Sequence, residues 1–253
     1  LCEIKNGNIQ INLPKADYVI YLDKDIYLAK MLEKSGYRLF NNSDFLKLCD
    51  DKNLTLIKCA NEGIRIVDTI PSPLVYTDTL KPSNFVFIDS VVEKLGLPII
   101  MKKVYGSLGE GVYLANTKDD LIELYSKYYR NPLLFEKYIE SSKGRSLRVL
   151  VVDQKVVGII ERNGREDFRS NFGSNTYSKL VKKPEIYIEF AQKIADLLKI
   201  EYAGIDLLYG KDGEPILCEI NSNAFFEEFE KTTKINVAKM YGEMIKKKCK
   251  ENE

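Results

Sequence analysis

The stretch that decides the fold is Tyr202–Asn221. Its sequence is Tyr-Ala-Gly-Ile-Asp-Leu-Leu-Tyr, then Gly-Lys-Asp-Gly, then Glu-Pro-Ile-Leu-Cys-Glu-Ile-Asn. Two apolar runs flank an Asp-Gly turn signal, which predicts a β-hairpin. Because side chains alternate along a strand, we expect Glu219 and Asn221 on one face. A two-residue loop at 212–213 would place Asp206 directly opposite Glu219, and a four-residue loop would place it diagonally on the same face.

The same hairpin gathers oxygen ligands. Either register brings Asp206, Glu219 and Asn221 within reach of one cation. Acids among Ile, Leu and Cys residues are costly to bury unless something pairs them. Carboxylate and amide oxygens suit Mg²⁺ that is held partly by substrate phosphates. The alternative interpretation is a hairpin with ordinary exposed acids.

Composition sets limits on the class of protein. The chain has 253 residues, enough for one large or two modest domains. A net charge of +1 gives no indication of a nucleic-acid or membrane surface, so we expect neither as a partner. No apolar run approaches the ~20 residues needed to span a bilayer. Leu1 is not a natural start, which predicts an incomplete N-terminal domain.

Cysteine and histidine usage narrows the chemistry. The five cysteines form no Cys-x-x-Cys pair and show no metal-binding spacing, which favours reduced thiols in a cytoplasmic protein. Histidine is absent, which excludes Ser-His-Asp and Cys-His catalysis and histidine-ligated zinc. Catalysis must therefore use carboxylates, lysine, arginine, backbone amides or a metal.

Hydrophobic periodicity predicts alternating strands and helices, which is typical of the α/β (α+β) class. Strands are expected at 18–22, 37–40, 64–69, 98–102, 112–115, 133–139, 146–152 and 155–161. Helices are expected at 26–35, from 43, at 52–62, from 83 to 96, from 117, from 184 and at 236–250.

A glycine-rich segment lies between two expected strands. It contains Gly106, Ser107, Gly109 and Gly111, and Lys102 precedes it. It is neither a Walker A loop, because Gly-Lys-Ser/Thr is missing, nor a dinucleotide fingerprint, because a strand follows it. A flexible hairpin of this kind can fold its amides over phosphates, with the lysine as a point charge. A plain β-turn is the alternative.

Two arginines stand out from their surroundings. Arg148 lies in an apolar strand, where an unpaired guanidinium would be costly. Arg169 lies in the polar cluster Asp-Phe-Arg-Ser-Asn at 167–171, which follows Glu161-Arg162. Converging arginines suit carboxylate or phosphate binding through paired hydrogen bonds. The strand at 135–139 could present backbone groups to an adenine edge, or be an ordinary core strand.

In this order, these motifs resemble the ATP-grasp superfamily and, within it, the RimK-like carboxylate–amine (alpha-L-glutamate) ligases. The similarity covers roughly residues 40–241. It implies an ATP-grasp fold in which two α+β lobes grip ATP, preceded by a partial Rossmann-like α/β domain. The implied boundaries are 1–70 for the N-terminal domain, 71–140 for the small lobe with the glycine-rich loop, and 141–253 for the large lobe with the metal site.

The resemblance also implies roles for matching residues. The phosphate-binding lysines of the family correspond to Lys52 and Lys102. Its mobile loop over the phosphates corresponds to Gly106, Ser107, Gly109 and Gly111. Its adenine-binding strand corresponds to Glu136, Lys137 and Tyr138. Groups near the γ-phosphate and the acyl acceptor correspond to Arg169 and Asn171. Mg²⁺ ligands correspond to Asp206, Glu219 and Asn221, in agreement with the hairpin argument.

Two departures from the family pattern matter. Many relatives place an acid at the position of Ser146 to hold the ribose hydroxyls, so here the serine does this more weakly or Glu140 substitutes. After Asn221, many relatives continue with Ser-Pro-Gly, whereas this chain has Ser-Asn-Ala-Phe-Phe at 222–226. In the family this segment borders the substrate-binding end of the site, so the substrate can differ from that of the ligase after which the family is named.

The resemblance implies an ATP-dependent ligase that joins a small-molecule or peptide carboxylate to an amino-acid amine through an acylphosphate. Arg148 and Arg169 are expected to stabilise developing negative charge, and Glu161 is a candidate base for the amine proton. The expected cofactors are ATP and Mg²⁺, with Mn²⁺ as an alternative metal. Glutamate is the family's usual amine, and a homodimer or homotetramer is the expected assembly. Three alternatives are a ligase that modifies a ribosomal peptide, a phosphotransferase and a non-ligating ATP-binding protein.

Overall fold

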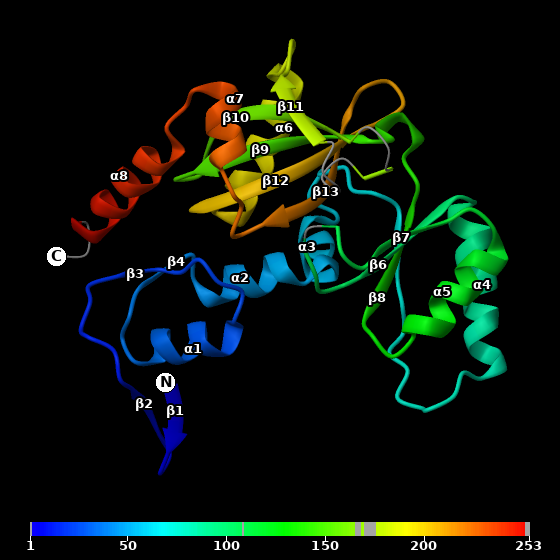
Figure 1. The fold of residues 1–253 in the computed structure, drawn as a ribbon, viewed down its shortest axis with the longest axis horizontal. Helices are drawn as coiled ribbons and strands as arrows, with labels where there is room; N and C mark the ends of the chain where they lie inside the picture. Colours follow the sequence, from blue (N-terminus) through cyan, green and yellow to red (C-terminus); the bar gives the residue numbers. More distant parts are fainter. Residues whose placement is uncertain (1, 108, 165–167, 170–175, 251–253) are drawn as a thin grey trace.

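The computed structural model describes residues 2–107, 109–164, 168–169 and 176–250. The chain is arranged as a small N-terminal α/β unit, a small lobe and a large lobe (Figure 1). The strands are β1 (Cys2–Lys5), β2 (Asn8–Ile11), β3 (Val19–Ile20), β4 (Leu39–Phe40), β5 (Thr69–Pro71), β6 (Ile99–Lys103), β7 (Val112–Ala115), β8 (Leu133–Lys137), β9 (Arg145–Val152), β10 (Lys155–Gly164), β11 (Thr176–Leu180), β12 (Tyr202–Tyr209) and β13 (Pro215–Asn221). The helices are α1 (Ile26–Lys34), α2 (Ser43–Asp50), α3 (Lys52–Cys59), α4 (Pro82–Leu95), α5 (Lys118–Tyr128), the 3₁₀ helix η1 (Glu140–Ser142), α6 (Glu185–Leu198), α7 (Glu227–Thr233) and α8 (Val237–Lys250).

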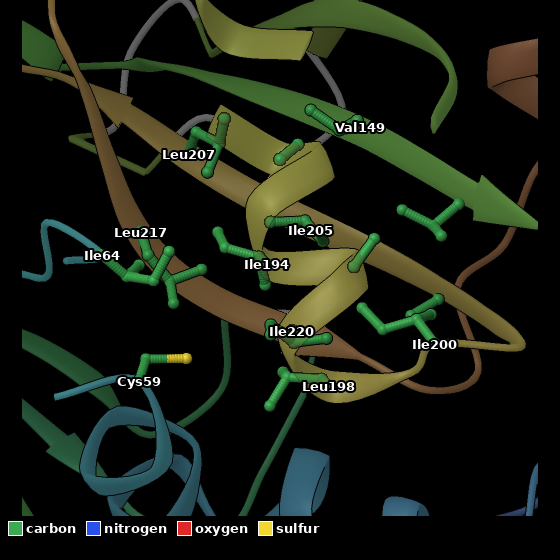
Figure 2. Close-up of a cluster of buried hydrophobic side chains, with 14 of the residues drawn as sticks. Cys59, Ile64, Val149, Ile194, Leu198, Ile200, Ile205, Leu207, Leu217 and Ile220 are labelled. Carbon is green, nitrogen blue, oxygen red and sulfur yellow. The ribbon is translucent and has the colours of Figure 1, made fainter. Parts of the chain in front are cut away.

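The large lobe is built on an antiparallel sheet in the order β11-β10-β9-β12-β13. One face packs against α6, with Val149, Ile194 and Ile205 in the core between them (Figure 2). Cys59 and Ile64, which lie far earlier in the chain, close the same core. Every second residue of the central strands is therefore apolar and buried, as expected for a covered sheet face.

The opposite face of this sheet is divided into two halves. At one end α7 and α8 cover it, and Leu150, Ile160 and Tyr202 form a second core there. At the other end the same alternation brings Arg148 and Asp206 to the face, as a directly opposed pair on neighbouring strands. A polar half of an otherwise covered sheet is where the lobe can meet a ligand.

The small lobe has a sheet in the order β5-β8-β6-β7. Helices α4 and α5 cover one of its faces, and Ile88, Tyr125 and Phe135 are fully buried in the core between them. Lys102 on β6 and Glu136 on β8 alternate to the other face, which looks toward the large lobe. The two sheets thus turn charged faces toward one cleft.

The N-terminal unit is a β3-α1-β4 connection with two parallel strands, preceded by the β1-β2 hairpin. Helices α2 and α3 do not stay within it. Phe45, Cys49 and Cys59 pack into the core of the large lobe, and both helices contact β13. Packing therefore crosses the boundary expected at residue 70, and we keep the division into 1–70, 71–140 and 141–253 as a proposal.

Several element predictions need correction. The strand expected at 64–69 is a single parallel bridge, Ile66 to Leu217, followed by β5. The helix expected at 52–62 ends at Cys59. Hairpin β1-β2, strand β11 and helix α7 had not been predicted, because short or mostly exposed elements carry little hydrophobic periodicity. Among the described residues, no helix combines the length and apolar character needed to cross a bilayer.

Strand alternation also decides which face of the sheet Glu161 occupies. Its strand partner is Leu147, so its side chain lies on the α6 face, away from Arg148. There it accepts a 2.5 Å hydrogen bond from the Tyr209 hydroxyl and pairs with Lys179 at 2.9 Å. Burial would raise the pKa of Glu161, but these two donors outweigh burial and lower it. On this face the carboxylate of Glu161 has structural partners, and its expected role as a base for the amine proton stays a prediction.

The core under the β12-β13 hairpin gives a first prediction. Ile205 is fully buried between the large sheet and α6, so Ile205→Ala should lower the free energy of unfolding by about 2–5 kcal/mol in urea denaturation. The matched control is Ile57→Ala, because this side chain is 63% exposed and should change stability by about 0.5 kcal/mol or less. Equal losses in both variants would contradict the assigned core.

Glu161 gives a pH-dependent prediction. Because its pKa is lowered in the folded state, its stabilisation is present above the ordinary carboxylate pKa of about 4.3 and is lost as pH falls through the lower folded value. Glu161→Gln should cost about 1–3 kcal/mol at pH 7, and less at acidic pH, in denaturation curves. A stability loss that did not shrink in acid would contradict this account.

Candidate functional site

The β12-β13 hairpin uses a loop that neither expected register contains. Gly210 donates its amide to the Glu214 carbonyl at 2.7 Å, which leaves three residues, 211–213, in the loop. The pairing then runs from Tyr209 opposite Pro215 until a β-bulge adds one residue at Cys218. The bulge restores the pairing of Asp206 with Glu219, directly opposite each other.

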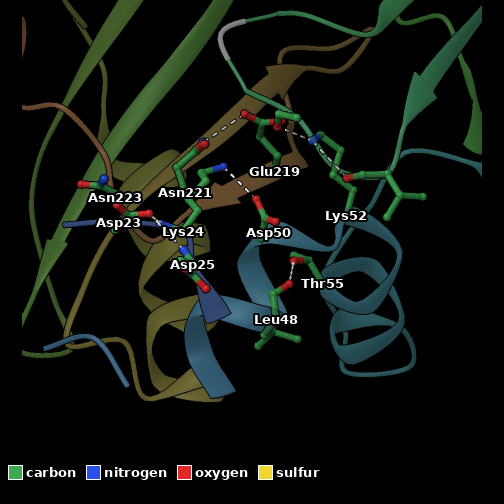
Figure 3. Close-up of polar contacts among 12 residues, drawn as sticks. Asp23, Lys24, Asp25, Leu48, Asp50, Lys52, Thr55, Glu219, Asn221 and Asn223 are labelled. Atoms are coloured by element: carbon green, nitrogen blue, oxygen red, sulfur yellow. Dashed lines mark hydrogen bonds and ion pairs between the residues drawn. The ribbon is translucent and has the colours of Figure 1, made fainter. Parts of the chain in front are cut away.

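The three predicted metal ligands lie together on one face. Asn221 donates through Nδ2 to Glu219 Oε1 at 3.0 Å (Figure 3). The same amide group donates to Asp206 Oδ2 at 3.2 Å. Within the described ranges, no group of three or more His, Cys, Asp and Glu side chains could hold a metal. Two carboxylates and one amide are nevertheless hard oxygen donors, and a half-turn of the Asn221 amide would present its oxygen beside them.

Asp206 is the most strongly paired acid of the site. Arg148 grips it with two hydrogen bonds, Nε to Oδ1 at 2.6 Å and Nη2 to Oδ2 at 2.9 Å. Arg162 contacts Oδ1 at 2.8 Å. Burial would raise the pKa of Asp206, but the two guanidinium groups outweigh burial and lower it. The carboxylate is therefore held ionised.

Arg162 is a site residue that the sequence analysis did not single out. It lies opposite Ser146 on β9 and occupies the site-facing position, whereas its neighbour Glu161 faces the other way. Its Nε is a buried N–H group without a hydrogen-bond partner in the described structure. One feature of the sequence could have indicated Arg162. An arginine that follows an apolar strand segment is costly to bury unpaired, as is Arg148.

A first cavity lies between the two lobes and contains most of the predicted nucleotide residues. On the small lobe, Lys102 forms an ion pair with Glu136 at 2.6 Å, and both side chains are buried. Burial disfavours the charged form of Lys102, but neighbouring groups, of which Cys218 and Glu136 act most strongly, raise its pKa. Glu136 thus holds the lysine in place, and Glu136 and Lys137 of β8 line the cavity.

The glycine-rich loop closes one side of this cavity. Lys52 Nζ donates to the Gly106 carbonyl at 3.0 Å, and Arg169 from the large lobe donates to the Gly109 carbonyl at 2.9 Å. Burial lowers the pKa of Lys52. Gly111 lies just outside the lining, at φ +74°, where an added Cβ would be 3.1 Å from the side chain of Lys103. Hydrogen bonds therefore connect the glycine-rich loop to the start of α3, through Lys52, and to the large lobe, through Arg169.

The remaining predicted residues divide as follows. The first cavity is lined by Lys52, Lys102, Gly106, Ser107, Gly109, Glu136, Lys137, Tyr138, Ser146, Arg169, Asp206 and Glu219, together with Arg162 and Cys218. Glu140, the expected alternative to Ser146, is exposed and lines neither cavity. Asn171 lies outside the described residues, so its expected role stays a prediction.

A second cavity of about 680 Å³ adjoins the first. Ser107, Arg162 and Glu219 line both cavities, so the two meet at the β12-β13 hairpin and the glycine-rich loop. Arg148 and Asn221 line only the second. A lysine-lined cleft that opens beside two arginines into a larger chamber is suited to phosphoryl transfer to a bound anion.

Comparison with known proteins agrees with this geometry. A family model described as a RimK-like ATP-grasp domain matches residues 52–245. Uncharacterized protein MG012 of Mycoplasma genitalium is 30% identical over 224 residues, which are 87% of this chain and 78% of that protein. Beta-citrylglutamate synthase B of Homo sapiens is 32% identical over 220 residues, which are 85% of this chain and 55% of that protein.

Solved structures share the fold. D-alanine–D-alanine ligase from Bacillus anthracis, complexed with ATP, has a TM-score of 0.69 at 24% identity and covers 89% of this chain and 76% of its own. The ATP-grasp ligase PsnB, complexed with a phosphomimetic variant of its minimal precursor, Mg and ADP, has a TM-score of 0.65 at 18% identity. That match covers 87% of this chain and 65% of PsnB. Because the family model matches most of its residues, this chain belongs to the RimK-like ATP-grasp family, a family of carboxylate–amine ligases.

Proposed function

We propose that this chain uses ATP to join a carboxylate to an amine through an acylphosphate. The observation that carries the proposal is the meeting of the two cavities at Glu219, with the phosphate-type lysines Lys52 and Lys102 on one side and Arg148 on the other. A nucleotide in the first cavity would present its terminal phosphate toward a carboxylate in the second. Such placement supplies most of the catalysis that phosphoryl transfer needs.

The proposed reaction has two steps. An oxygen of the substrate carboxylate attacks the γ-phosphorus of ATP, the bond to ADP breaks, and an acylphosphate forms. The amine nitrogen then attacks the acyl carbon, the C–N bond forms, and inorganic phosphate leaves with the bonding electron pair. The proton lost by the amine passes to the departing phosphate or to solvent. Arg148, Arg162 and Arg169 would neutralise the negative charge that develops at the transferred group.

Mg²⁺ fits the donor set of the hairpin. Asp206, Glu219 and Asn221 would hold it, and when bound it would supply positive charge that neutralises the phosphates. Glu219 is the acid best placed to bind the ion first, because Asp206 is already engaged by two arginines. Mn²⁺, which also takes oxygen ligands, is an alternative ion.

The substrates belong to the proposal as well. The name of the human relative describes a product that contains glutamate, which supports an amino-acid amine such as glutamate. The structures of PsnB with its precursor support a peptide-modifying ligase as the second candidate. A small-molecule carboxylate and a peptide carboxylate are both compatible with the size of the second cavity.

The setting of the reaction is also proposed. Five free cysteines are in accord with the reducing cytoplasm. A homodimer or homotetramer is the proposed assembly, and it can be measured by light scattering on the purified protein.

Product analysis tests the function directly. The purified protein is incubated with ATP, Mg²⁺ and pools of amino acids, and products are followed by mass spectrometry. We expect ADP, phosphate and an amide product. A phosphorylated hydroxyl product would replace ligation by phosphotransfer, and nucleotide binding without turnover would indicate a non-ligating protein.

Glu219→Gln tests the metal assignment without leaving the two arginines unpaired. We expect Mg²⁺-dependent ATP turnover to fall by about 100-fold or more, because one negative ligand is lost where charge must be balanced. Circular dichroism should show an unchanged fold. The matched control is Glu243→Gln on α8, an exposed acid that lines neither cavity. Wild-type turnover in Glu219→Gln would remove the metal site from the proposal.

A further inference from the structure

The second cavity has a wall that the family comparison does not reach. Residues Leu22, Asp23 and Lys24, in the loop between β3 and α1, line it together with Arg148 and Asn221. This loop precedes residue 52, where the family match begins. The N-terminal unit therefore contributes side chains to the proposed substrate chamber.

The position of this loop is fixed by hydrogen bonds. Asn223, just after β13, donates to the Leu22 carbonyl at 2.9 Å. Asp23 Oδ1 accepts from the Lys24 and Asp25 amides at 2.6 and 3.0 Å. Lys24 is thus presented to the cavity from a backbone anchored to the large lobe.

Lys24 differs from the other cations of the chamber. Arg148 and Arg162 are both engaged by Asp206, a proposed metal ligand. Lys24 instead pairs with Asp50 at 2.9 Å (Figure 3), and Asp50 lines neither cavity. An ammonium has three N–H groups, so an anion can share Lys24 without displacing Asp50 or disturbing the metal ligands.

Acidic side chains also line the chamber, but described contacts engage them. Asp23 accepts from the loop backbone, and Glu219 accepts from Asn221. Glu227 pairs with Lys231 at 2.6 Å, and Glu228 accepts from a serine hydroxyl at 2.6 Å. These partners reduce the repulsion that an entering anion would meet.

We propose that Lys24 is a specificity-determining residue that binds a carboxylate of the substrate other than the one that reacts. The inference rests on the proposed ligase function. The carboxylate can come from a second acid group of the acyl substrate or from the α-carboxylate of an amino-acid amine, and both would form the same charge-assisted hydrogen bond. The competing explanation is that Lys24 only compensates Asp50, whose charge lies at the unfavourable C-terminal end of α2.

Equilibrium binding tests the proposal without turnover. Citrate, as the acid, and L-glutamate, as the amine, are each titrated calorimetrically into protein saturated with Mg²⁺ and a non-hydrolysable ATP analogue. Citrate monoamide, L-isoglutamine and L-glutamine are the carboxamide counterparts. For one of the two acids, we expect Lys24→Met to raise Kd about tenfold and to abolish the preference over its amide. The affected acid identifies the source of the carboxylate.

Three controls make the result decisive. Lys30→Met removes a lysine of the same unit that pairs with Asp44 at 3.1 Å and lines neither cavity, so it should leave Kd unchanged. Lys24→Arg keeps the charge and should retain the preference for the carboxylate. If Lys24→Met does not fold, Lys24→Met with Asp50→Asn leaves no unpaired acid and should still weaken binding tenfold.

The two levels of proposal fail differently. If the ATP analogue and Mg²⁺ do not bind wild-type protein, the proposed function is overturned. If they bind normally, but Lys24→Met binds both acids as tightly as wild-type protein or neither acid binds wild-type protein, only the assignment of Lys24 is overturned.

Discussion

The site depends on one buried charge arrangement, the Asp206 carboxylate between the Arg148 and Arg162 guanidinium groups. These residues come from three adjacent strands, β12, β9 and β10, so the contacts also hold the polar half of the large sheet in register. Burying such charges is costly, and only close pairing compensates for it. An isolated carboxyl here would be driven toward its neutral form, and an isolated guanidinium would leave a buried charge without compensation. This arrangement keeps the Asp206 carboxylate ionised and holds the two guanidinium groups beside the cleft.

The small lobe also buries charged side chains, and it compensates them with an ion pair. Lys102 and Glu136 are buried as a pair on the sheet face that looks across the cleft. Among the described residues, Arg169 of the large lobe donates a hydrogen bond across the cleft to the Gly109 carbonyl at 2.9 Å.

The N-terminal unit links these lobes to the substrate side. Its helices α2 and α3 place Cys49 and Cys59 in the core of the large lobe, and α3 begins with Lys52 at the glycine-rich loop. Its β3-α1 loop reaches the second cavity, where Lys24 lies. One short segment therefore reaches the first cavity through Lys52 and the second cavity through Lys24. This explains why 1–70 behaves as part of the site and not as an appendage.

Local patterns were enough to predict the hairpin, the glycine-rich loop and the clustering of Asp206, Glu219 and Asn221, because turn residues and strand alternation act over a few residues. Three features needed the tertiary structure. The bulge at Cys218 restores the pairing that a three-residue loop would have shifted. Packing against α6 turns Glu161 away from the cleft and leaves Arg162 facing it. The sequence of two adjacent polar residues does not by itself determine which of them faces the cleft. The approach of Lys24 to the chamber depends on contacts between residues about 200 positions apart, which the local sequence does not specify.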